Sequence, residues 1–242
     1  MAKSSPFEVI YERLGANFSE YDGWRLPEDF GDAAAESKAL LEGSAAFDLS
    51  SFGRIRVTGA GGWGLLDSLL AGSGEEMEID KWIWSVICRE SGGSYVVRLA
   101  RTNKGYIVFT MPAETQSVLS LLQAGAGDES GAVKIVDITE QTALMGIYGP
   151  KAVGAVDRIL PFDVSKIEPF CVLNMSVFMM KITIIRGSWV GLDGLELLCP
   201  ASAAVMAAGA VAKYHKQAGI VPAGMFCLQN AMASAEMGAK RL

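Results

Sequence analysis

The 242-residue chain carries 21 Lys and Arg against 27 Asp and Glu, and 50% of its residues are hydrophobic. A net charge of -6 provides no basic field for a phosphate backbone, so nucleic acid is not expected as a partner. The apolar runs are interrupted by charged or polar residues before they reach the length of a membrane span, and residues 1–6 lack the apolar core of a secretory signal. We therefore expect a cytoplasmic protein, with no membrane partner and one large domain over residues 1–242.

The N-terminal part predicts two helices. Apolar residues at helical spacing between Pro6 and Leu14 indicate a short amphipathic helix. A second helix is predicted from about Asp32 to Glu42, with Asp32 as its N-cap and Gly43 as its end.

Two similar strand–turn–helix units follow. Residues 54–58 alternate polar and apolar side chains, which predicts a strand, and a glycine turn then leads into a leucine-rich helix over about 65–70. Residues 142–148 predict a second strand, followed by a Gly149-Pro150 turn and a helix that Pro161 ends. The order of these elements predicts an α+β fold of two ferredoxin-like lobes, in which a ligand binds where the lobes meet.

Each of these units is followed by strands and a closing helix. After the first unit, strands are predicted at 82–88, 95–101 and 106–110, and a helix at 112–123. After the second, strands are predicted at 177–185 and 195–198, and a helix at 202–217. We therefore expect pseudo-repeat halves of about 45–124 and 132–218, joined by the polar segment 125–131.

Cysteine and histidine give no sign of a metal site. The four cysteines form no CxxC pair and have no close histidine, so the sequence predicts buried free thiols: Cys88, Cys171, Cys199 and Cys227. His215 is the single histidine and lies between lysines, which favours a solvated helix face.

Residues 59–64 match the GxGxxG pattern between a predicted strand and a predicted helix. Dinucleotide binding would follow if this turn held a pyrophosphate. Trp63 would crowd the phosphates, however, and no strand ending in an acidic residue follows about twenty residues later. The alternative is a plain tight turn, which we favour over a nucleotide-dependent oxidoreductase.

An ordered series of motifs covers nearly the whole chain and resembles the folate-binding domain of the glycine-cleavage T-protein (aminomethyltransferase) family. The matching stretches are Tyr21–Pro27, Phe47–Gly59, Gly92-Gly93, Gly149–Ala152, Arg186 with Gly191, Asp193–Glu196 and Val221–Gly224. The resemblance implies duplicated α+β lobes around a central opening that holds tetrahydrofolate, which accepts a one-carbon unit. Family members that transfer aminomethyl groups usually carry a further C-terminal β-rich domain, which the sequence given lacks.

The sequence departs from the family at its acidic positions. Val96 and Val97 stand where the family carries the catalytic acid, and valine neither accepts a proton nor stabilises a cationic intermediate. Leu192 stands where the family pairs a glutamate with the pterin ring, and Asp193 would substitute if the loop shifted by one residue. The sequence therefore assigns no catalytic residue and leaves enzymatic activity undecided.

The family's ligand-binding positions are nevertheless partly retained. Aromatic residues stand at three of them, where they either sandwich a flat ring or fill a collapsed opening. The predicted cofactor-binding residues are Phe52, Trp84, Val96, Arg186, Trp189, Leu192, Asp193 and Glu196. The resemblance predicts a T-protein-like protein that binds tetrahydrofolate or a related flat ligand in one-carbon or methyl transfer. The alternative is a non-catalytic binding or assembly subunit, with a partner chain, of a larger folate-linked oxidase or demethylase.

Overall fold

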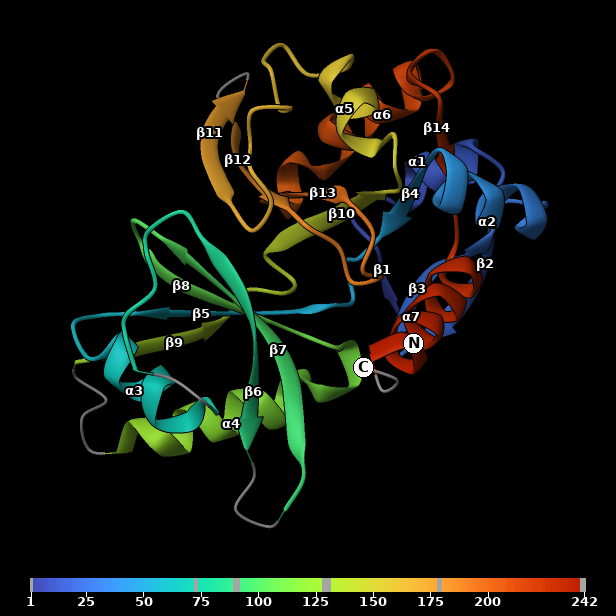
Figure 1. The fold of residues 1–242 in the computed structure, drawn as a ribbon. Coiled ribbons are helices and arrows are strands. Elements are labelled where there is room, and N and C mark those ends of the chain that lie inside the picture. Colours follow the sequence, from blue (N-terminus) through green and yellow to red (C-terminus); the bar gives the residue numbers. More distant parts are fainter. Residues whose placement is uncertain (1, 72–73, 89–91, 128–131, 178–179, 240–242) are drawn as a thin grey trace. The chain divides into compact units, whose positions relative to one another are not determined.

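The computed structural model describes the chain except for residues 1, 72–73, 89–91, 128–131, 178–179 and 240–242 (Figure 1). It has an α+β fold that divides into two compact units. Unit 1 comprises Met1–Ser51, Thr142–Pro169 and Met175–Leu242, and unit 2 comprises Phe52–Gln141 and Phe170–Asn174. None of the helices in the described part is long and apolar enough to cross a membrane.

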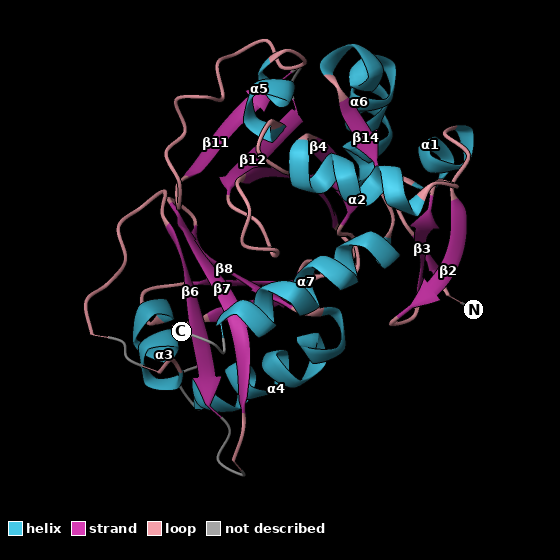
Figure 2. Ribbon diagram, turned by 45° about the vertical axis from the view of Figure 1, so that its right-hand side comes forward, coloured by secondary structure: helices cyan, strands magenta, loops and turns pink. Residues whose placement is uncertain are grey.

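Unit 2 contains a five-stranded antiparallel sheet in the order β6-β7-β8-β5-β9. Its strands are β5 (Gly53–Thr58), β6 (Trp82–Cys88), β7 (Ser94–Thr102), β8 (Gly105–Thr110) and β9 (Lys134–Asp137). Helices α3 (Gly62–Leu69) and α4 (Thr115–Ala126) pack on one face of the sheet, and the short helix η1 (Pro112–Glu114) precedes α4 (Figure 2). Leu66, Val118 and Leu122 of these helices are completely buried against strand residues such as Val97 and Leu99.

A six-stranded sheet in the order β11-β12-β13-β10-β4-β14 belongs to unit 1, apart from the residues of β11 up to Asn174, which belong to unit 2. Its strands are β4 (Ser44–Asp48), β10 (Thr142–Tyr148), β11 (Val172–Val177), β12 (Met180–Arg186), β13 (Gly194–Pro200) and β14 (Ile220–Pro222). Two helices associated with this sheet follow β10 and β13, namely α5 (Ala152–Asp157) and α6 (Ala204–Ala218), the latter preceded by η3 (Ala201–Ala203). A smaller sheet of β1 (Lys3–Ser4), β3 (Trp24–Asp29) and β2 (Asn17–Tyr21) belongs to the same unit, together with α1 (Glu8–Arg13), α2 (Ala33–Glu42) and α7 (Met225–Ala239).

Four strands of each large sheet have the same order, in agreement with the predicted duplicated α+β fold. Reading across each sheet, β6-β7-β8-β5 corresponds to β11-β12-β13-β10. The next strand is β9 in one sheet and β4 in the other, but β9 follows helix α4 in the chain, whereas β4 comes before both repeats. In the turn after β5, the Gly62 N–H donates a hydrogen bond of 3.0 Å to the Gly59 carbonyl oxygen. In the turn after β10, the Ala152 N–H donates a hydrogen bond of 3.0 Å to the Gly149 carbonyl oxygen. The same strand–turn–helix element therefore occurs in both units.

Glycine is required at the start of both turns. Gly59 and Gly149 have φ angles of +110° and +120°, in the region that side chains disfavour. A Cβ atom at Gly59 would lie 2.1 Å from the Ala132 carbonyl oxygen, and one at Gly149 would lie 2.6 Å from that of Gly43. The close approach of backbone to backbone explains the first glycine of the GxGxxG pattern without a nucleotide.

Most predicted elements are present, with changed boundaries. The Asp32 carboxylate accepts a hydrogen bond from the Ala35 N–H at 2.9 Å, which confirms the N-cap. The single strand predicted at 177–185 is wrong, because residues on either side of 178–179, which lie outside the described residues, form the separate strands β11 and β12. The helix after Gly149-Pro150 ends at Asp157 rather than continuing to Pro161.

The expectation that all four cysteines are buried is wrong. Cys199 and Cys227 are buried, but Cys171 is half-buried and Cys88 is exposed at the end of the edge strand β6. His215 of α6 is half-buried, and its Nδ1 lies 2.7 Å from the Ala212 carbonyl oxygen.

Candidate functional site

A row of alternating aromatic and cationic side chains crosses the sheet of unit 2. Trp84 on β6 is opposite Arg98 on β7, Arg98 is opposite Phe109 on β8, and Phe109 is opposite Arg54 on β5. Side chains alternate along a strand, and Val97 and Leu99 face the helices, so Arg98 faces the other side of the sheet. We call these four residues the cross-strand row.

Arg98 is surrounded by aromatic rings. Its guanidinium carbon lies 5.1 Å from the ring centroid of Trp82, 5.6 Å from that of Trp84 and 5.3 Å from that of Phe109. The side chain is only 1% exposed, so its charge has lost most of its hydration. Attraction to the ring faces offsets part of that loss and holds the two indoles in position.

Trp84 and Val96 form the exposed part of this surface. Trp84 is 42% exposed and Val96 is 51% exposed, while Val97 is completely buried on the helix side. Val96 is paired with Val86, which lies two residues along β6 from Trp84. The Trp84 and Val96 side chains are therefore diagonal neighbours on one face of the sheet. Of the two valines at the family's acidic position, Val96 is therefore the one that a ligand on this face would meet.

Phe52 lies directly before β5 and is 1% exposed. Its carbonyl oxygen accepts a hydrogen bond from Arg54 Nη1 at 2.6 Å. Arg54 is also completely buried, and its Nη2 donates to the Thr139 carbonyl oxygen. The Phe52 ring contributes to the packed interior, and the Phe52 carbonyl oxygen contacts Arg54 of the cross-strand row.

Four of the predicted residues of unit 1 lie at or near the connection between β12 and β13. Arg186 and Asp193 form a bidentate ion pair, with Nη2 2.8 Å from Oδ2 and Nε 3.2 Å from Oδ1. Arg186 Nη1 also donates to the Ile167 carbonyl oxygen at 2.6 Å. Both ends of the connection are thereby fixed, and both carboxylate oxygens of Asp193 bind within the protein.

The remaining predicted residues of unit 1 are buried or half-buried. Trp189 is 7% exposed, and Leu192 is half-buried with its carbonyl oxygen accepting a bond from the Ser188 hydroxyl at 2.5 Å. Glu196 on β13 is completely buried, and its Oε1 accepts a hydrogen bond from the Tyr148 hydroxyl at 2.7 Å. The Glu196 carboxylate therefore has an internal role in joining β10 to β13.

The structure thus brings the predicted residues together within each unit, as Trp84 with Val96 and as Arg186 with Asp193. The sequence prediction missed Arg98 and Phe109, whose environment is decided by neighbouring strands. A signal was nevertheless available, because Arg98 is flanked by Val97 and Leu99 in the middle of an apolar strand. A cation between two apolar residues of an interior strand indicates a specific partner on one face of the sheet.

The protein-family model described as "GCVT N-terminal domain" matches residues 7–239 of this chain. The chain belongs to this family. An aminomethyltransferase of Geobacillus thermodenitrificans is 28% identical over 229 residues, which are 93% of this chain and 62% of that protein. One from Saccharopolyspora erythraea is also 28% identical, over 93% of this chain and 61% of its own length. This GCVT-domain chain therefore spans about three fifths of the length of these curated relatives.

Two solved structures share the GCVT-domain fold. Glycine cleavage system aminomethyltransferase T from Bartonella henselae has a TM-score of 0.84 and 19% identity, covering 96% of this chain and 62% of that one. Heterotetrameric sarcosine oxidase from Corynebacterium sp. U-96 has a TM-score of 0.55 and 16% identity, covering 76% of this chain and 91% of that one. At these identities the likeness establishes the fold alone.

Proposed function

We propose that this GCVT-domain protein binds tetrahydrofolate or a related flat ligand and serves one-carbon or methyl transfer. The observation that carries the proposal is the indole of Trp84, which is 42% exposed beside Val96. The indole contacts Trp82 edge-on, at 5.9 Å between ring centroids, and the Arg98 guanidinium. An exposed indole held in one position offers a face on which a flat ring stacks.

The residues fit the stacking of a reduced folate but supply few charges for its pterin ring. Leu192 has no polar side-chain atom, and both oxygens of Asp193 bind Arg186. Tetrahydrofolate would supply the nitrogen that accepts a one-carbon unit. Because valine accepts no proton, we propose that this chain binds and orients the ligand without the family's proton-transfer step at Val96.

Calorimetric titration of the full chain with 5-methyltetrahydrofolate tests this function. We expect a micromolar dissociation constant, equivalent to about -8 kcal/mol. Trp84→Ala should weaken binding up to about tenfold, since aromatic stacking contributes about 0.5–1.5 kcal/mol. Trp63→Ala is the matched control, because this indole lies on α3 and packs against Tyr106 on the helix side of the sheet.

Absence of binding up to millimolar ligand would overturn the proposal. Equal weakening by the two tryptophan variants, with both folded by circular dichroism, would also count against a stacking site at Trp84.

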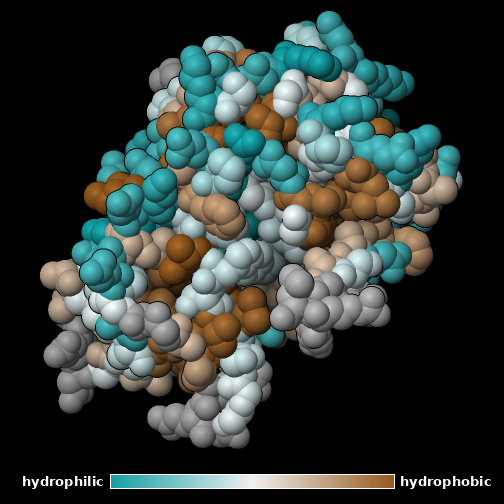
Figure 3. Space-filling model, in the orientation of Figure 1, coloured by the Kyte–Doolittle hydropathy of each residue, from teal (hydrophilic) through white to brown (hydrophobic). Residues whose placement is uncertain are grey.

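The second candidate is a non-catalytic binding or assembly subunit. The fold neighbour from Corynebacterium is part of a heterotetrameric oxidase, and this chain has apolar side chains at its surface. Phe226 of α7 and Val205 of α6 are 50% and 52% exposed, and brown areas interrupt the hydrophilic surface in Figure 3. Native mass spectrometry of the protein isolated from its own host should then show a hetero-oligomer, whereas a lone monomer would contradict this candidate.

A further inference from the structure

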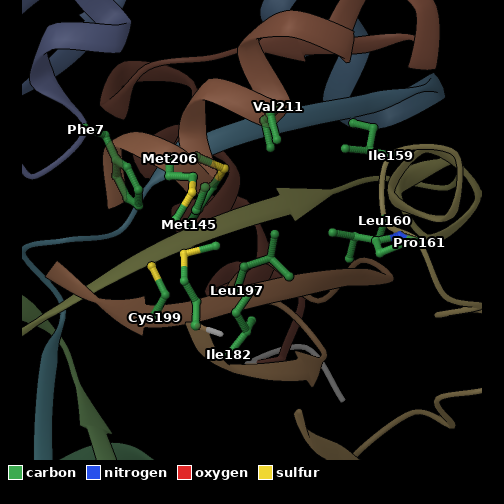
Figure 4. A pocket seen from close by; sticks show the side chains of 13 residues that line it. Phe7, Met145, Ile159, Leu160, Pro161, Ile182, Leu197, Cys199, Met206 and Val211 are labelled. Carbon is green, nitrogen blue, oxygen red and sulfur yellow. The ribbon is translucent and has the colours of Figure 1, made fainter. Parts of the chain in front are cut away.

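Unit 1 contains an apolar cavity of about 350 Å³ between its sheet and helix α6 (Figure 4). Met145 of β10, Ile182 of β12 and Leu197 of β13 line it on the sheet side. Ala207 and Val211 line it on the helix side, and the segment after α5 closes one end. None of the predicted folate-binding residues contributes to this cavity.

The duplicated topology provides an internal comparison for this space. In unit 2 the corresponding helix α4 places Val118 and Leu122 against its sheet, and both side chains are completely buried. Helix α6 instead presents Ala207 and Ala210 toward the cavity, beside the larger Met206 and Val211. Small side chains on one helix therefore leave open a volume that branched side chains occupy in the other unit.

An empty space of this size is unfavourable in a protein interior. Interiors are packed as densely as organic crystals, and side chains around a void lose dispersion contacts on one side. An apolar cavity of 150 Å³ already binds benzene. The cavity of unit 1 has more than twice that volume, so it has room for a larger molecule of the same kind.

The lining determines the chemistry of the occupant. All thirteen lining side chains are hydrophobic, and their only heteroatoms are the sulfurs of Met145, Met180, Met206 and Cys199. A charged group would lose its hydration there with no partner to compensate. Methionine side chains are flexible and polarisable, so they adapt to apolar molecules of different shape.

From this geometry we propose that unit 1 binds an uncharged apolar small molecule, with its hydrocarbon part enclosed between α6 and the sheet. Met206 lines the cavity and is 54% exposed, so this side chain lies where the cavity meets solvent. The sheet, the helix and the segment around Leu160 and Pro161 enclose the space from several sides. A partly enclosed volume with walls on several sides suits a small molecule better than the surface of a partner protein.

Titration of the full chain with N-phenyl-1-naphthylamine, a neutral fluorescent probe, tests the proposal. We expect a saturable rise in fluorescence with one site per chain, reversed by an excess of the uncharged competitor 1-decanol. Ala207→Phe should lower the affinity at least tenfold, because the added ring occupies the cavity. Ala124→Phe is the matched control, since Ala124 is an exposed residue of α4 and should leave binding unchanged.

Binding that does not saturate, or that is equally strong in the Ala207→Phe variant, would overturn the proposal. If circular dichroism shows that this variant does not fold, Ala210→Leu fills the same space with a smaller group. It should also lower the affinity for the probe. Failure of this experiment leaves the folate proposal intact, because the two sites share no residue.

Discussion

Adjacent residues of β7 lie in opposite environments. Val96 is 51% exposed, Val97 is completely buried among the residues that pack under α3 and α4, and Arg98 is buried among aromatic rings on the other face. The alternation of side chains along a strand explains why three neighbours differ so strongly. It also means that an acid restored at Val96 would lie at the surface, whereas one at Val97 would lie in the core.

Stability measurements on two single substitutions test this assignment. Val96→Asp should change the free energy of unfolding by no more than about 0.5 kcal/mol, as for most surface positions. Val97→Asp should lower it by several kcal/mol or prevent folding, because it buries a carboxylate with no partner. Urea denaturation measures both, and similar effects of the two substitutions would contradict the register of β7.

The strand–turn–helix element shows how one residue determines a turn. In unit 1, Gly149 has a φ of +120°, and a Cβ there would also lie 2.7 Å from the Leu40 carbonyl oxygen at the end of α2. The turn thus packs its backbone directly against the end of another helix. Two costs, an unfavourable φ and a steric overlap, therefore coincide at a single position.

Substituting this glycine should be strongly destabilising. We expect Gly149→Ala to lower the free energy of unfolding by about 1–3 kcal/mol or more. Gly154→Ala is the matched control, because Gly154 lies within α5 with open space around its Cα, and alanine should stabilise that helix by about 0.5–1 kcal/mol. Thermal denaturation of both variants measures the difference, and a neutral Gly149→Ala would refute the close approach.

At the scale of the whole chain, unit 1 joins segments that are far apart in sequence. The Glu36 carboxylate accepts hydrogen bonds from the N–H of Phe30 at 2.6 Å and from that of Gly224 at 2.9 Å. A Cβ at Gly224 would lie 2.0 Å from the Glu28 carbonyl oxygen, so the chain before α7 lies against β3. Glu36 therefore connects the N-terminal sheet to the segment that begins the last helix.

The pKa of Glu36 gives this connection a pH dependence. Burial raises the pKa above its ordinary value of 4.5, the two N–H donors oppose that rise, and Asp29 and Asp32 add to it. The folded protein therefore holds the proton more tightly than the unfolded chain does. Linkage then requires that Glu36 contribute less to stability as pH rises from about 4.5 through the raised pKa.

Comparison of the wild type with Glu36→Gln tests the direction of this pH dependence of stability, because glutamine does not titrate. The free energy of unfolding of the wild type, minus that of the variant, should fall between pH 4 and pH 7 in urea denaturation. Glu42→Gln is the control on the same helix, since the Glu42 side chain is 69% exposed. An increase with pH at Glu36, or the same slope at both positions, would contradict the assignment.

Local patterns predicted many of the elements that depend on nearby residues. The cap at Asp32, the strand Thr142–Tyr148 and the strand Trp82–Cys88 follow from side-chain periodicity and turn chemistry, and the structure contains them. The sequence prediction missed β4, β9 and β14, which are short and join their sheets through partners distant in sequence. It also missed the local hairpin of β2 and β3 and the last helix, α7. Pairing across long separations is decided by the fold, which no local window contains.

The ordered motifs by themselves indicated the family, and the resemblance implied the duplicated α+β fold. Individual turns and strands could be predicted because glycine turns and alternating side chains are set by local backbone geometry. Tertiary structure alone decided that Val96 faces outward, that Arg98 is buried among aromatic rings, that Asp193 binds Arg186 and that a cavity lies beneath α6. Each of these depends on which side chains meet across neighbouring strands and helices. Burial and packing depend on these contacts between elements, and the residues adjacent in sequence do not specify them.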